Sequence, residues 1–275
     1  MPHSSTDRHH PFFDVPRPVV IGHRGAAGTH PENTLLAFEA ALDQGAQILE
    51  SDIHVTRDGV PILLHDPSVE RVTEATGQAS AIDWAELGSF DAGYHSEDES
   101  GETPHRGRGI TIPSVEQAFE RFPDARFNLE VKCPDRAAIR ATLDLIERFG
   151  RADRTLLAAG EHNIMQDLRE ITSTHTARPA FGASLNEIVA VIGSALGGTP
   201  MPEGVMALQI PSQFGENPLA TKQIIDYAHE NGVEVHVWTI NDLDEIASLL
   251  DRGVDGIVTD LPGQMQDWLV RDGRR

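Results

Sequence analysis

The stretch GAQILESDIHVTRDGVPILLHD, residues 45–66, decides the fold because it joins an apolar strand pattern to several reactive side chains. The run from Ile48 to Val55 is typical of a buried strand, in which successive side chains point to opposite faces. Glu50 and Asp52 therefore share one face. Two carboxylates in an apolar strand are costly unless a cation neutralises them, and an all-oxygen pair suits a hard divalent ion such as Mg²⁺ or Ca²⁺.

The second half of this stretch brings an imidazole to the same place. Asp58-Gly59 is a turn signal, and the apolar run from Val60 to Leu64 ends in His65-Asp66. A hairpin across this turn would place His65, which can titrate near neutral pH, at a strand end close to the carboxylate pair. The alternative interpretation is a hairpin whose carboxylates merely face solvent.

Outward from this stretch, apolar runs of strand length alternate with segments of helical periodicity. The expected strands are Val19 to Gly22, Ile48 to Val55, Phe127 to Val131, Thr155 to Ala158, Ala177 to Phe181, Val205 to Ile210, Val233 to Ile240 and Gly256 to Thr259. The expected helices are Leu35 to Leu42, Asp135 to Phe149, Glu161 to Thr174, Ser184 to Ile192, Asn217 to Asn231 and Asp242 to Asp251.

This alternation predicts a parallel sheet with helices outside it. If Val60 to Leu64 is counted as a hairpin extension of the strand at Ile48 to Val55, eight strands remain. That is the number in a closed (β/α)₈ TIM barrel. An open doubly wound sheet is the alternative, but no Gly-rich dinucleotide loop follows the first strand. We expect one domain at residues 17–275, interrupted by an insertion at 66–112, which is too long for a simple loop.

Composition limits the possible partners. There are 43 acidic and 22 basic residues, giving a formal charge of −21, which repels nucleic acid and anionic membranes. Cys133 is the only cysteine, so an intramolecular disulfide is excluded and a reducing compartment fits. Residues 1–16 are rich in His, Pro and Ser and are expected to form a disordered tail. Without a signal-peptide core or a transmembrane run, we expect a cytoplasmic protein with no stable membrane association.

Further candidate site residues lie at the predicted strand ends. Glu130 and Lys132 are two apart on one strand, so they share a face in the same way as Glu50 and Asp52. Active sites of barrels lie at the carboxyl ends of their strands, where His23, Arg24 and Trp238 are also expected. Three carboxylates could hold one divalent ion, and Arg24 with Lys132 could hold phosphate oxygens. A structural salt-bridge network is the alternative.

Five motifs appear in a fixed order along residues 19–262. They are HRGAAGTHPENT at 23–34, ESDIHVTRDGVPILLHD at 50–66, NLEVK at 128–132, VWTIN at 237–241 and VDGIVTDLP at 254–262. In this order they resemble the glycerophosphodiester phosphodiesterase family, whose members form a (β/α)₈ barrel with a small insertion after the His-Asp dipeptide. The resemblance implies metal-dependent hydrolysis of small-molecule glycerophosphodiesters to sn-glycerol 3-phosphate and an alcohol.

The resemblance also implies a role for each matching residue. Glu50, Asp52 and Glu130 would bind the metal, and His23 and His65 would serve as acid and base. Substrate would be held by residues with a cationic or aromatic side chain, namely Arg24, Lys132 and Trp238. The segment SVERVTEATGQ at 68–78 departs from the family pattern by being more acidic, which leaves the preferred head group open.

Two rival functions remain, and the oligomeric state is not indicated. A phospholipase D-like or phosphatidylinositol-specific phosphodiesterase on the same barrel would need an apolar lip at the barrel mouth, and the acidic insertion argues against one. A barrel that binds phosphodiesters without cleaving them is the other rival. The presence of both His23 and His65 disfavours it, because a binding protein needs no groups to transfer protons.

Overall fold

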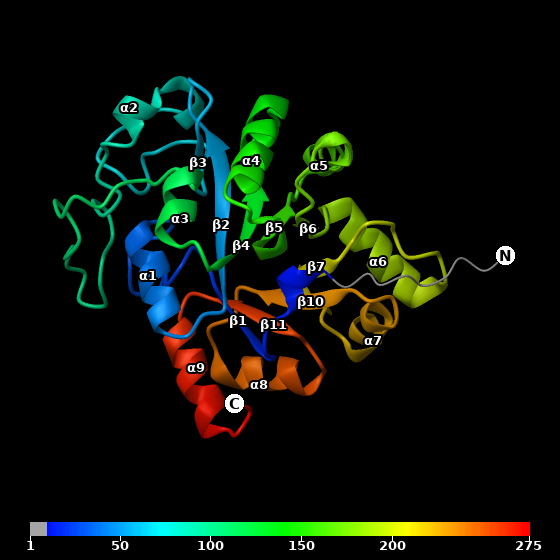
Figure 1. The fold of residues 1–275 in the computed structure, drawn as a ribbon. Helices are drawn as coiled ribbons and strands as arrows, with labels where there is room; N and C mark the ends of the chain where they lie inside the picture. The colour runs from blue at the N-terminus through cyan, green and yellow to red at the C-terminus, as the bar shows by residue number, and fades with distance from the viewer. Residues whose placement is uncertain (1–9) are drawn as a thin grey trace.

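Eight parallel strands form a nearly closed barrel in the computed structural model, which describes residues 10–275 (Figure 1). Neighbouring strands follow the order β6-β5-β4-β2-β1-β11-β10-β7. Beside the two end strands, the backbone N–H of Met206 donates a hydrogen bond of 3.1 Å to the carbonyl of Phe181. The predicted (β/α)₈ barrel is therefore confirmed.

The strands are β1 (Val19–Gly22), β2 (Ile48–Val55), β3 (Pro61–Leu63), β4 (Arg126–Val131), β5 (Thr155–Ala158), β6 (Ala180–Phe181), β7 (Ala207–Pro211), β8 (Gln213–Phe214), β9 (Asn217–Pro218), β10 (Glu234–Trp238) and β11 (Gly256–Thr259). The α-helices are α1 (Leu35–Asp43), α2 (Trp84–Leu87), α3 (Val115–Arg121), α4 (Arg136–Arg148), α5 (His162–Thr174), α6 (Leu185–Gly197), α7 (Lys222–Glu230), α8 (Leu243–Asp251) and α9 (Pro262–Arg271). Three short 3₁₀ helices are η1 (Pro11–Phe13), η2 (Ala79–Ala81) and η3 (Ala152–Arg154).

Side-chain caps fix where several barrel helices begin. Thr34, Asp135 and Asp242 each accept a hydrogen bond from a backbone N–H in the first turn of α1, α4 and α8. Ser114 and Ser184 form complete capping boxes at α3 and α6. Because each cap satisfies N–H groups that have no partner inside the helix, it also fixes the length of the preceding loop.

The amino end of the barrel is closed by the segment that precedes β1. Phe12 and Phe13 in η1 are buried and pack with apolar residues at the starts of several strands, among them Val19 and Ile48. Arg126 at the start of β4 donates a hydrogen bond to the carbonyl of Phe12. Residues 1–9 of the predicted disordered tail lie outside the described residues. For residues 10–16 the prediction is wrong, because the two phenylalanines have an apolar site to fill.

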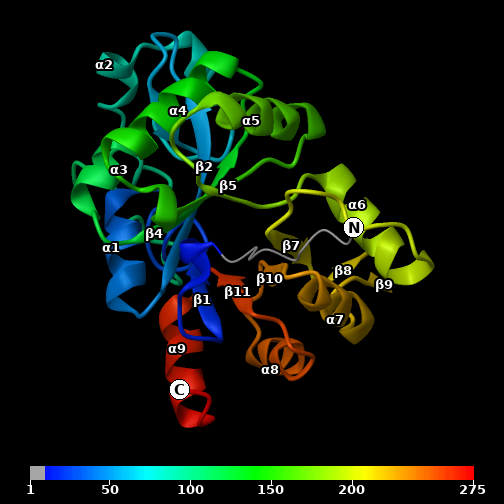
Figure 2. The same cartoon turned by 45° about the vertical axis from the view of Figure 1, so that its right-hand side comes forward.

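The insertion after β3 packs as a small unit of its own. Val69, Leu87 and Ile112 are buried and pack against Ile62 and Leu64 of the β3 hairpin. Its α2 lies on the opposite side of the barrel from α6, as the two views agree (Figures 1 and 2). Among residues 10–275, no helix is both long enough and apolar enough to cross a membrane.

Candidate active site

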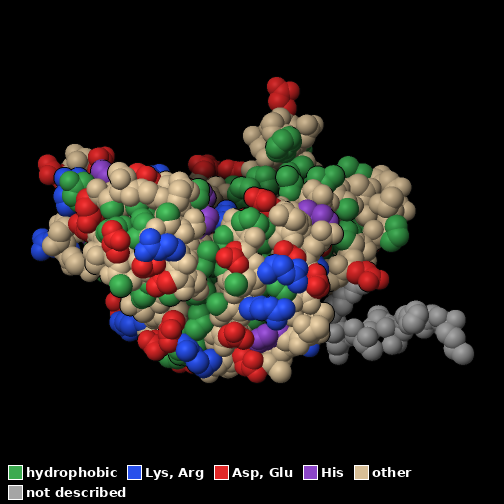
Figure 3. Space-filling model, turned by 90° about the horizontal axis from the view of Figure 1, so that it is seen from above, with side chains coloured by type: hydrophobic (Ala, Val, Ile, Leu, Met, Phe, Trp, Pro, Cys, Tyr) green, Lys and Arg blue, Asp and Glu red, His purple; other side chains and the backbone are tan. Residues whose placement is uncertain are grey.

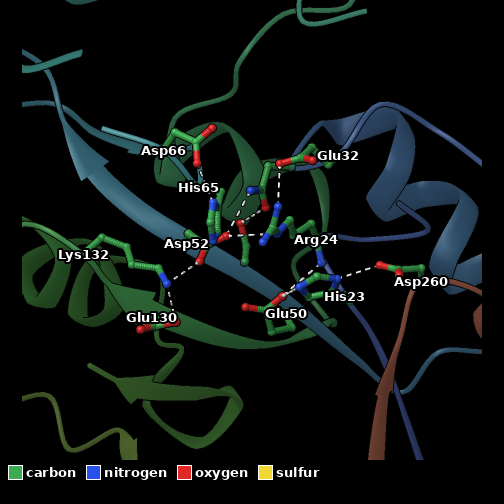
Figure 4. A network of polar contacts seen from close by, with 12 residues as sticks. His23, Arg24, Glu32, Glu50, Asp52, His65, Asp66, Glu130, Lys132 and Asp260 are labelled. Carbon is green, nitrogen blue, oxygen red and sulfur yellow. Dashed lines mark hydrogen bonds and ion pairs between the residues drawn. The ribbon is translucent and has the colours of Figure 1, made fainter. Parts of the chain in front are cut away.

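A cavity of about 740 Å³ opens at the carboxyl ends of the barrel strands. All eight candidate site residues line it, so the fold brings together what the strand pattern predicted. Figure 4 shows most of them as one polar network. The lining residues are His23, Arg24, Glu50, Asp52, His65, Asn128, Glu130, Lys132, Ala158, Ala159, Gly160, Glu161, His162, Asn163, Ala183, Leu185, Asn186, Ile188, Gln209, Trp238, Thr239 and Val258.

His23, directly after β1, is anchored by a carboxylate from the other end of the chain. Its Nδ1 lies 2.6 Å from Oδ1 of Asp260, and Asn241 donates a hydrogen bond of 2.7 Å to Oδ2 of the same carboxylate. Burial alone would lower the pKa of His23, but the hydrogen bond to Asp260 and the charge of Glu50 outweigh it and raise the pKa. The Asp260 bond places a proton on Nδ1, which leaves Nε2 as the nitrogen that can exchange a proton.

His65 is held in the same way on the neighbouring edge of the site. Its Nδ1 lies 2.7 Å from Oδ1 of Asp66, and Arg71 in turn bonds Oδ2 of Asp66. Burial alone would raise the pKa of Asp66, but its hydrogen bonds with Arg71 and His65 lower it. Both imidazoles therefore carry a carboxylate at Nδ1 and keep Nε2 available. This is the arrangement in which a carboxylate orients a general acid or base.

The three candidate metal ligands lie on two paired strands. Glu50 and Asp52 are on β2, and the register pairs Asp52 with Glu130 on β4. Lys132 Nζ lies 3.3 Å from Asp52 Oδ1 and 2.7 Å from Glu130 Oε2. Two carboxylates thus share one ammonium, so the predicted convergence of charge is present.

Of the three carboxylates, Glu50 has the fewest partners to balance its negative charge. It is buried, and among residues 10–275 it accepts just one hydrogen bond, from the backbone N–H of Arg24, while His23 Nε2 lies 4.0 Å away. Burial first, and then the charge of Asp52, raise the pKa of Glu50 to about 8. A divalent ion would relieve this unfavourable charge, and three carboxylates are oxygen ligands of the type that Mg²⁺ and Ca²⁺ prefer. The donor set therefore suits such an ion, although the oxygens of Glu50, Asp52 and Glu130 do not all lie within 4.8 Å of one another here, where Lys132 Nζ contacts both Asp52 and Glu130.

A second group of acidic residues and a histidine, on the outside of the barrel, fits an ion pair better than a metal. Within the described part of the chain, Asp144, Glu147 and His175 are the one such group whose ligand atoms lie within 4.8 Å of one another. His175 Nδ1 already accepts a hydrogen bond from the backbone N–H of Ala177, so Nε2 carries the proton and faces Asp144 at 3.0 Å. A metal ion would need that nitrogen unprotonated.

Two cations, Arg24 and Lys132, complete the charged part of the cavity. Arg24 adopts a left-handed backbone conformation with φ of 48°, which aims its N–H at Glu50. Gly25 follows with φ of 88°, and a Cβ there would lie 2.6 Å from the backbone of Ala37. Arg24 Nη1 is held by Glu32 at 2.9 Å, while its buried Nε has no hydrogen-bond partner. Nε forms an ion pair with Asp52 Oδ2 at 3.6 Å, which is longer than a hydrogen bond, so this donor could still bond a phosphate oxygen.

Several residues of this network, Asp66 and Arg71 included, had no role in the sequence analysis. Asp260 and Asn241 anchor His23, Glu32 holds Arg24, and Asn33 donates a hydrogen bond of 3.2 Å to Asp52. Each lies in a loop within a quoted motif, so the motifs marked the positions. The periodicity of strands and helices could not assign the contacts, because loop side chains have no fixed direction.

Because the insertion follows His65 directly, the sequence predicts that it lies over the barrel mouth and sets which alcohol is accepted, but the lining of the cavity does not support this placement. No residue of 66–112 lines the cavity; that side ends at His65. The insertion instead contacts the site through Arg71, which bonds Asp66 and also holds Glu32 with two hydrogen bonds of 2.7 Å. The physical reason is its own apolar core, which ties it to β3 at the side of the barrel.

Comparison with known proteins agrees with this geometry. The model of the glycerophosphoryl diester phosphodiesterase family matches residues 23–264. A probable glycerophosphodiester phosphodiesterase 2 from Mycobacterium tuberculosis is 30% identical, with 93% of this chain and 92% of the relative covered. A human protein named lysophospholipase D is 25% identical, with 90% and 85% covered.

A solved structure shows the same fold. An Oleispira antarctica phosphodiesterase, determined in complex with the product sn-glycerol-3-phosphate, superposes with a TM-score of 0.73 at 24% sequence identity. The match covers 92% of this chain and 97% of that one.

Proposed function

Because the chain belongs to the glycerophosphoryl diester phosphodiesterase family, we propose that it cleaves glycerophosphodiesters to sn-glycerol 3-phosphate and an alcohol, using a divalent ion held by Glu50, Asp52 and Glu130. The product seen in the Oleispira antarctica relative supports the choice of products. The observation that carries the proposal is the pair of carboxylate-anchored imidazoles, His23 and His65, in one cavity with the three proposed metal ligands and the cations Arg24 and Lys132.

In the proposed binding step, positive charges in the cavity attract the phosphate of the substrate. Among residues 10–275, Arg24 and Lys132 are the only Arg or Lys residues that line the cavity, and they would hold the phosphate oxygens. A bound Mg²⁺ or Ca²⁺ would neutralise phosphate charge as a Lewis acid. With a net charge of −21, the molecule repels anionic substrates, so this local positive charge is necessary.

The chemical step uses the two free Nε2 atoms. We assign His65 as the base that takes the proton of the attacking hydroxyl, and His23, whose raised pKa favours the imidazolium, as the acid that protonates the leaving alcohol. As the new bond to phosphorus forms, the bond from phosphorus to the alcohol oxygen breaks. Asp66 and Asp260 keep both rings oriented throughout.

The attacking hydroxyl is proposed to be the 2-hydroxyl of the glycerol, with water opening the cyclic phosphate afterwards. An intramolecular nucleophile gains an effective molarity on the order of 10⁵ M or more when it is well placed. Water attacking directly is the alternative. A 2-deoxy analogue of glycerophosphocholine should turn over far more slowly than the natural compound; equal turnover, with ¹⁸O from water entering in one step, would show that water attacks first.

The activity itself is tested by glycerol 3-phosphate release from glycerophosphocholine, with and without EDTA. We expect release that stops with EDTA and returns with excess Mg²⁺ or Ca²⁺. Release that is insensitive to EDTA would refute the metal site, and no release from any glycerophosphodiester would refute the proposed substrate class. We also propose a cytoplasmic location, which the single cysteine supports and fractionation of the host cells would test.

A further inference from the structure

The buried end of the cavity holds two amide side chains that the proposed reaction does not use. Asn128 lies on β4 as the register partner of Glu50 on β2, and Gln209 lies on β7. Both line the cavity, yet they are only 6% and 9% exposed, so they lie at its buried end and not at its mouth. We call Asn128 and Gln209 the amide pair.

Neither side chain of the amide pair has a hydrogen-bond partner within residues 10–275, and Oδ1 of Asn128 is fully buried. One other buried atom without a hydrogen bond belongs to a residue that lines the cavity, Nε of Arg24, which the proposed function assigns to phosphate. An unpaired buried amide is unfavourable, so its presence in a binding cavity indicates that a ligand completes its hydrogen bonds.

Small residues make room beside the amide pair. The strands β5 and β6 separate β4 from β7 around the barrel, and Ala158 of β5 lines the cavity between them. A Cβ on Gly182, which follows β6, would lie 2.7 Å from Oε1 of Gln209 and 3.0 Å from Cβ of Ala158. The Gln209 amide can therefore occupy its position only because residue 182 has no side chain.

Strand order places Gln209 on the side of the leaving alcohol. His65 follows β3, which pairs with β2, and His23 follows β1; the barrel then continues through β11 and β10 to β7. In the proposed reaction His65 takes the proton of the glycerol hydroxyl and His23 protonates the leaving alcohol. The alcohol would therefore extend past His23 toward β7 and the buried end of the cavity.

The apolar side chains at the cavity mouth are less able to distinguish one alcohol from another. Leu185 and Trp238 line the cavity and are 61% and 43% exposed. Figure 3 shows hydrophobic side chains gathered on one side of a face of the molecule, beside a projecting lobe. An apolar surface cannot strongly reject a molecule that merely adds a hydroxyl, whereas a site that hydrogen-bonds a hydroxyl strongly rejects the analogue that lacks it.

Resting on the proposed function, we propose that Asn128 and Gln209 determine which alcohol is accepted, by hydrogen-bonding the hydroxyl groups of a polyol. A primary amide offers both a donor and an acceptor, and a hydroxyl is complementary to both. A quaternary ammonium group offers neither and is bound instead by several aromatic rings. Among residues 10–275, Trp238 is the only Phe, Tyr or Trp that lines the cavity.

The test compares kcat/KM for three substrates, glycerophosphoglycerol, glycerophosphopropanol and glycerophosphocholine, by release of sn-glycerol 3-phosphate. The first two have the same charge and a three-carbon alcohol, and they differ in two hydroxyl groups of that alcohol. We expect the ratio of kcat/KM for glycerophosphoglycerol to that for glycerophosphopropanol to be about 100 or more, because the amide pair would be left unpaired by propanol. Glycerophosphocholine should resemble the propanol ester.

Variants separate recognition from the different reactivity of the two alcohols. Asn128→Leu and Gln209→Met replace an amide by an apolar side chain of similar size, and each should lower the ratio by about tenfold. Gly182→Ala should lower it as well, because the new Cβ displaces the Gln209 amide. Gln213→Met changes an exposed amide of β8 outside the cavity and should leave the ratio unchanged. Thermal unfolding checks the folding of each variant.

The possible failures of this inference and of the proposed function are distinct. A ratio near one in the parent protein would refute the inference while the proposed function stands. A large ratio that both amide variants keep would mean that the amide pair does not contact the leaving alcohol, and a preference for glycerophosphocholine over glycerophosphoglycerol would exclude a polyol; either result would overturn the inference. No glycerol 3-phosphate from any substrate would refute the proposed function instead.

Discussion

At the scale of single residues, the clearest division in the site is between the proposed metal ligands and the proposed proton carriers. Glu50, Asp52 and Glu130 have no role in orienting the histidines, which are held by Asp260 and Asp66 instead. Asp52 and Glu130 can therefore be changed without direct effect on the histidines, whereas Glu50 lies 4.0 Å from His23 Nε2 and its charge also raises the pKa of His23.

Glu50→Gln, Asp52→Asn and Glu130→Gln should each weaken binding of Mg²⁺ or Ca²⁺ and lower activity together, because each removes a charged oxygen from one site. Titration calorimetry measures the affinity. Glu147→Gln is the matched control, since it alters the external acidic group and should leave the affinity unchanged. Unchanged affinity in all three site variants would refute the metal assignment whatever happened to the rate.

His23→Ala and His65→Ala should lower kcat by about 10²-fold or more and change KM little, the usual result of losing an acid or base. Steady-state kinetics with glycerophosphocholine separates the two constants. His95→Ala removes an exposed imidazole of the insertion and should behave like the parent protein. A loss confined to KM would contradict a role in proton transfer.

Cys133 should be nearly inert in the native protein. Burial first, and then the charge of Asp135, raise the pKa of this thiol from 9.0 to about 11, which lowers the thiolate fraction near pH 8 about a hundredfold. Iodoacetamide labelling followed by mass spectrometry should be slow at pH 8 and fast in urea. Rapid native labelling would mean that the loop after β4 opens readily.

At the scale of elements, strands and helices with a strong local sequence pattern were predicted accurately, and those with a weak pattern were not. The boundaries of β2, β5 and β11 were predicted to the residue, because each is a short segment rich in β-branched or other apolar residues between turn signals. The helix expected from Asn217 begins at Lys222 instead, since Gln213–Pro218 form the β8-β9 hairpin and Thr221 supplies the cap. Helix α6 runs on to Gly197, and α9 was not predicted at all.

The site could be predicted only where an element fixes side-chain direction. Alternation along β2 and β4 placed Glu50, Asp52 and Glu130 together. Asp260 and Glu32 lie in loops, and their roles depend on a neighbour that closure of the barrel brings from a distant part of the chain. Local sequence contains no information of that kind.

The insertion should influence catalysis through Arg71 and not through the cavity wall. Arg71→Ala removes the bonds to Asp66 and Glu32, so His65 and Arg24 lose their outer supports, and we expect kcat/KM to fall by about 10- to 100-fold, as for small misplacements of reacting groups. Arg71→Lys should restore little, because an ammonium cannot reproduce the two-pronged contact. The pH profile of kcat/KM should change shape as well.

A matched substitution separates this effect from general loosening of the insertion. Arg106→Ala removes an exposed arginine that stacks on Tyr94 within the same segment. It should leave both kcat/KM and its pH profile as they are. Equal losses in the two variants would mean that Arg71 supports only the fold of the insertion.

At the scale of the whole molecule, the two ends of the barrel have separate tasks. Chemistry lies at the carboxyl ends of the strands, while Phe12 closes the other end with its side chain fully buried. Phe12→Ala should lower the free energy of unfolding by about 3–5 kcal/mol. Urea titration measures this change, and kcat under native conditions should stay close to that of the parent. A change below about 1 kcal/mol would mean that the barrel end does not depend on this residue.

That same closure has a consequence for synthesis on the ribosome. Phe12 and Phe13 emerge first, yet their site needs Ala207 of β7 and Val258 of β11, and Val19 of β1 pairs with Gly256. At about 5–20 residues per second, the nascent chain waits roughly 10–50 s for these partners. Two exposed phenylalanines during that interval are a natural target for a chaperone, and the barrel can close only once β7 and β11 have left the ribosome.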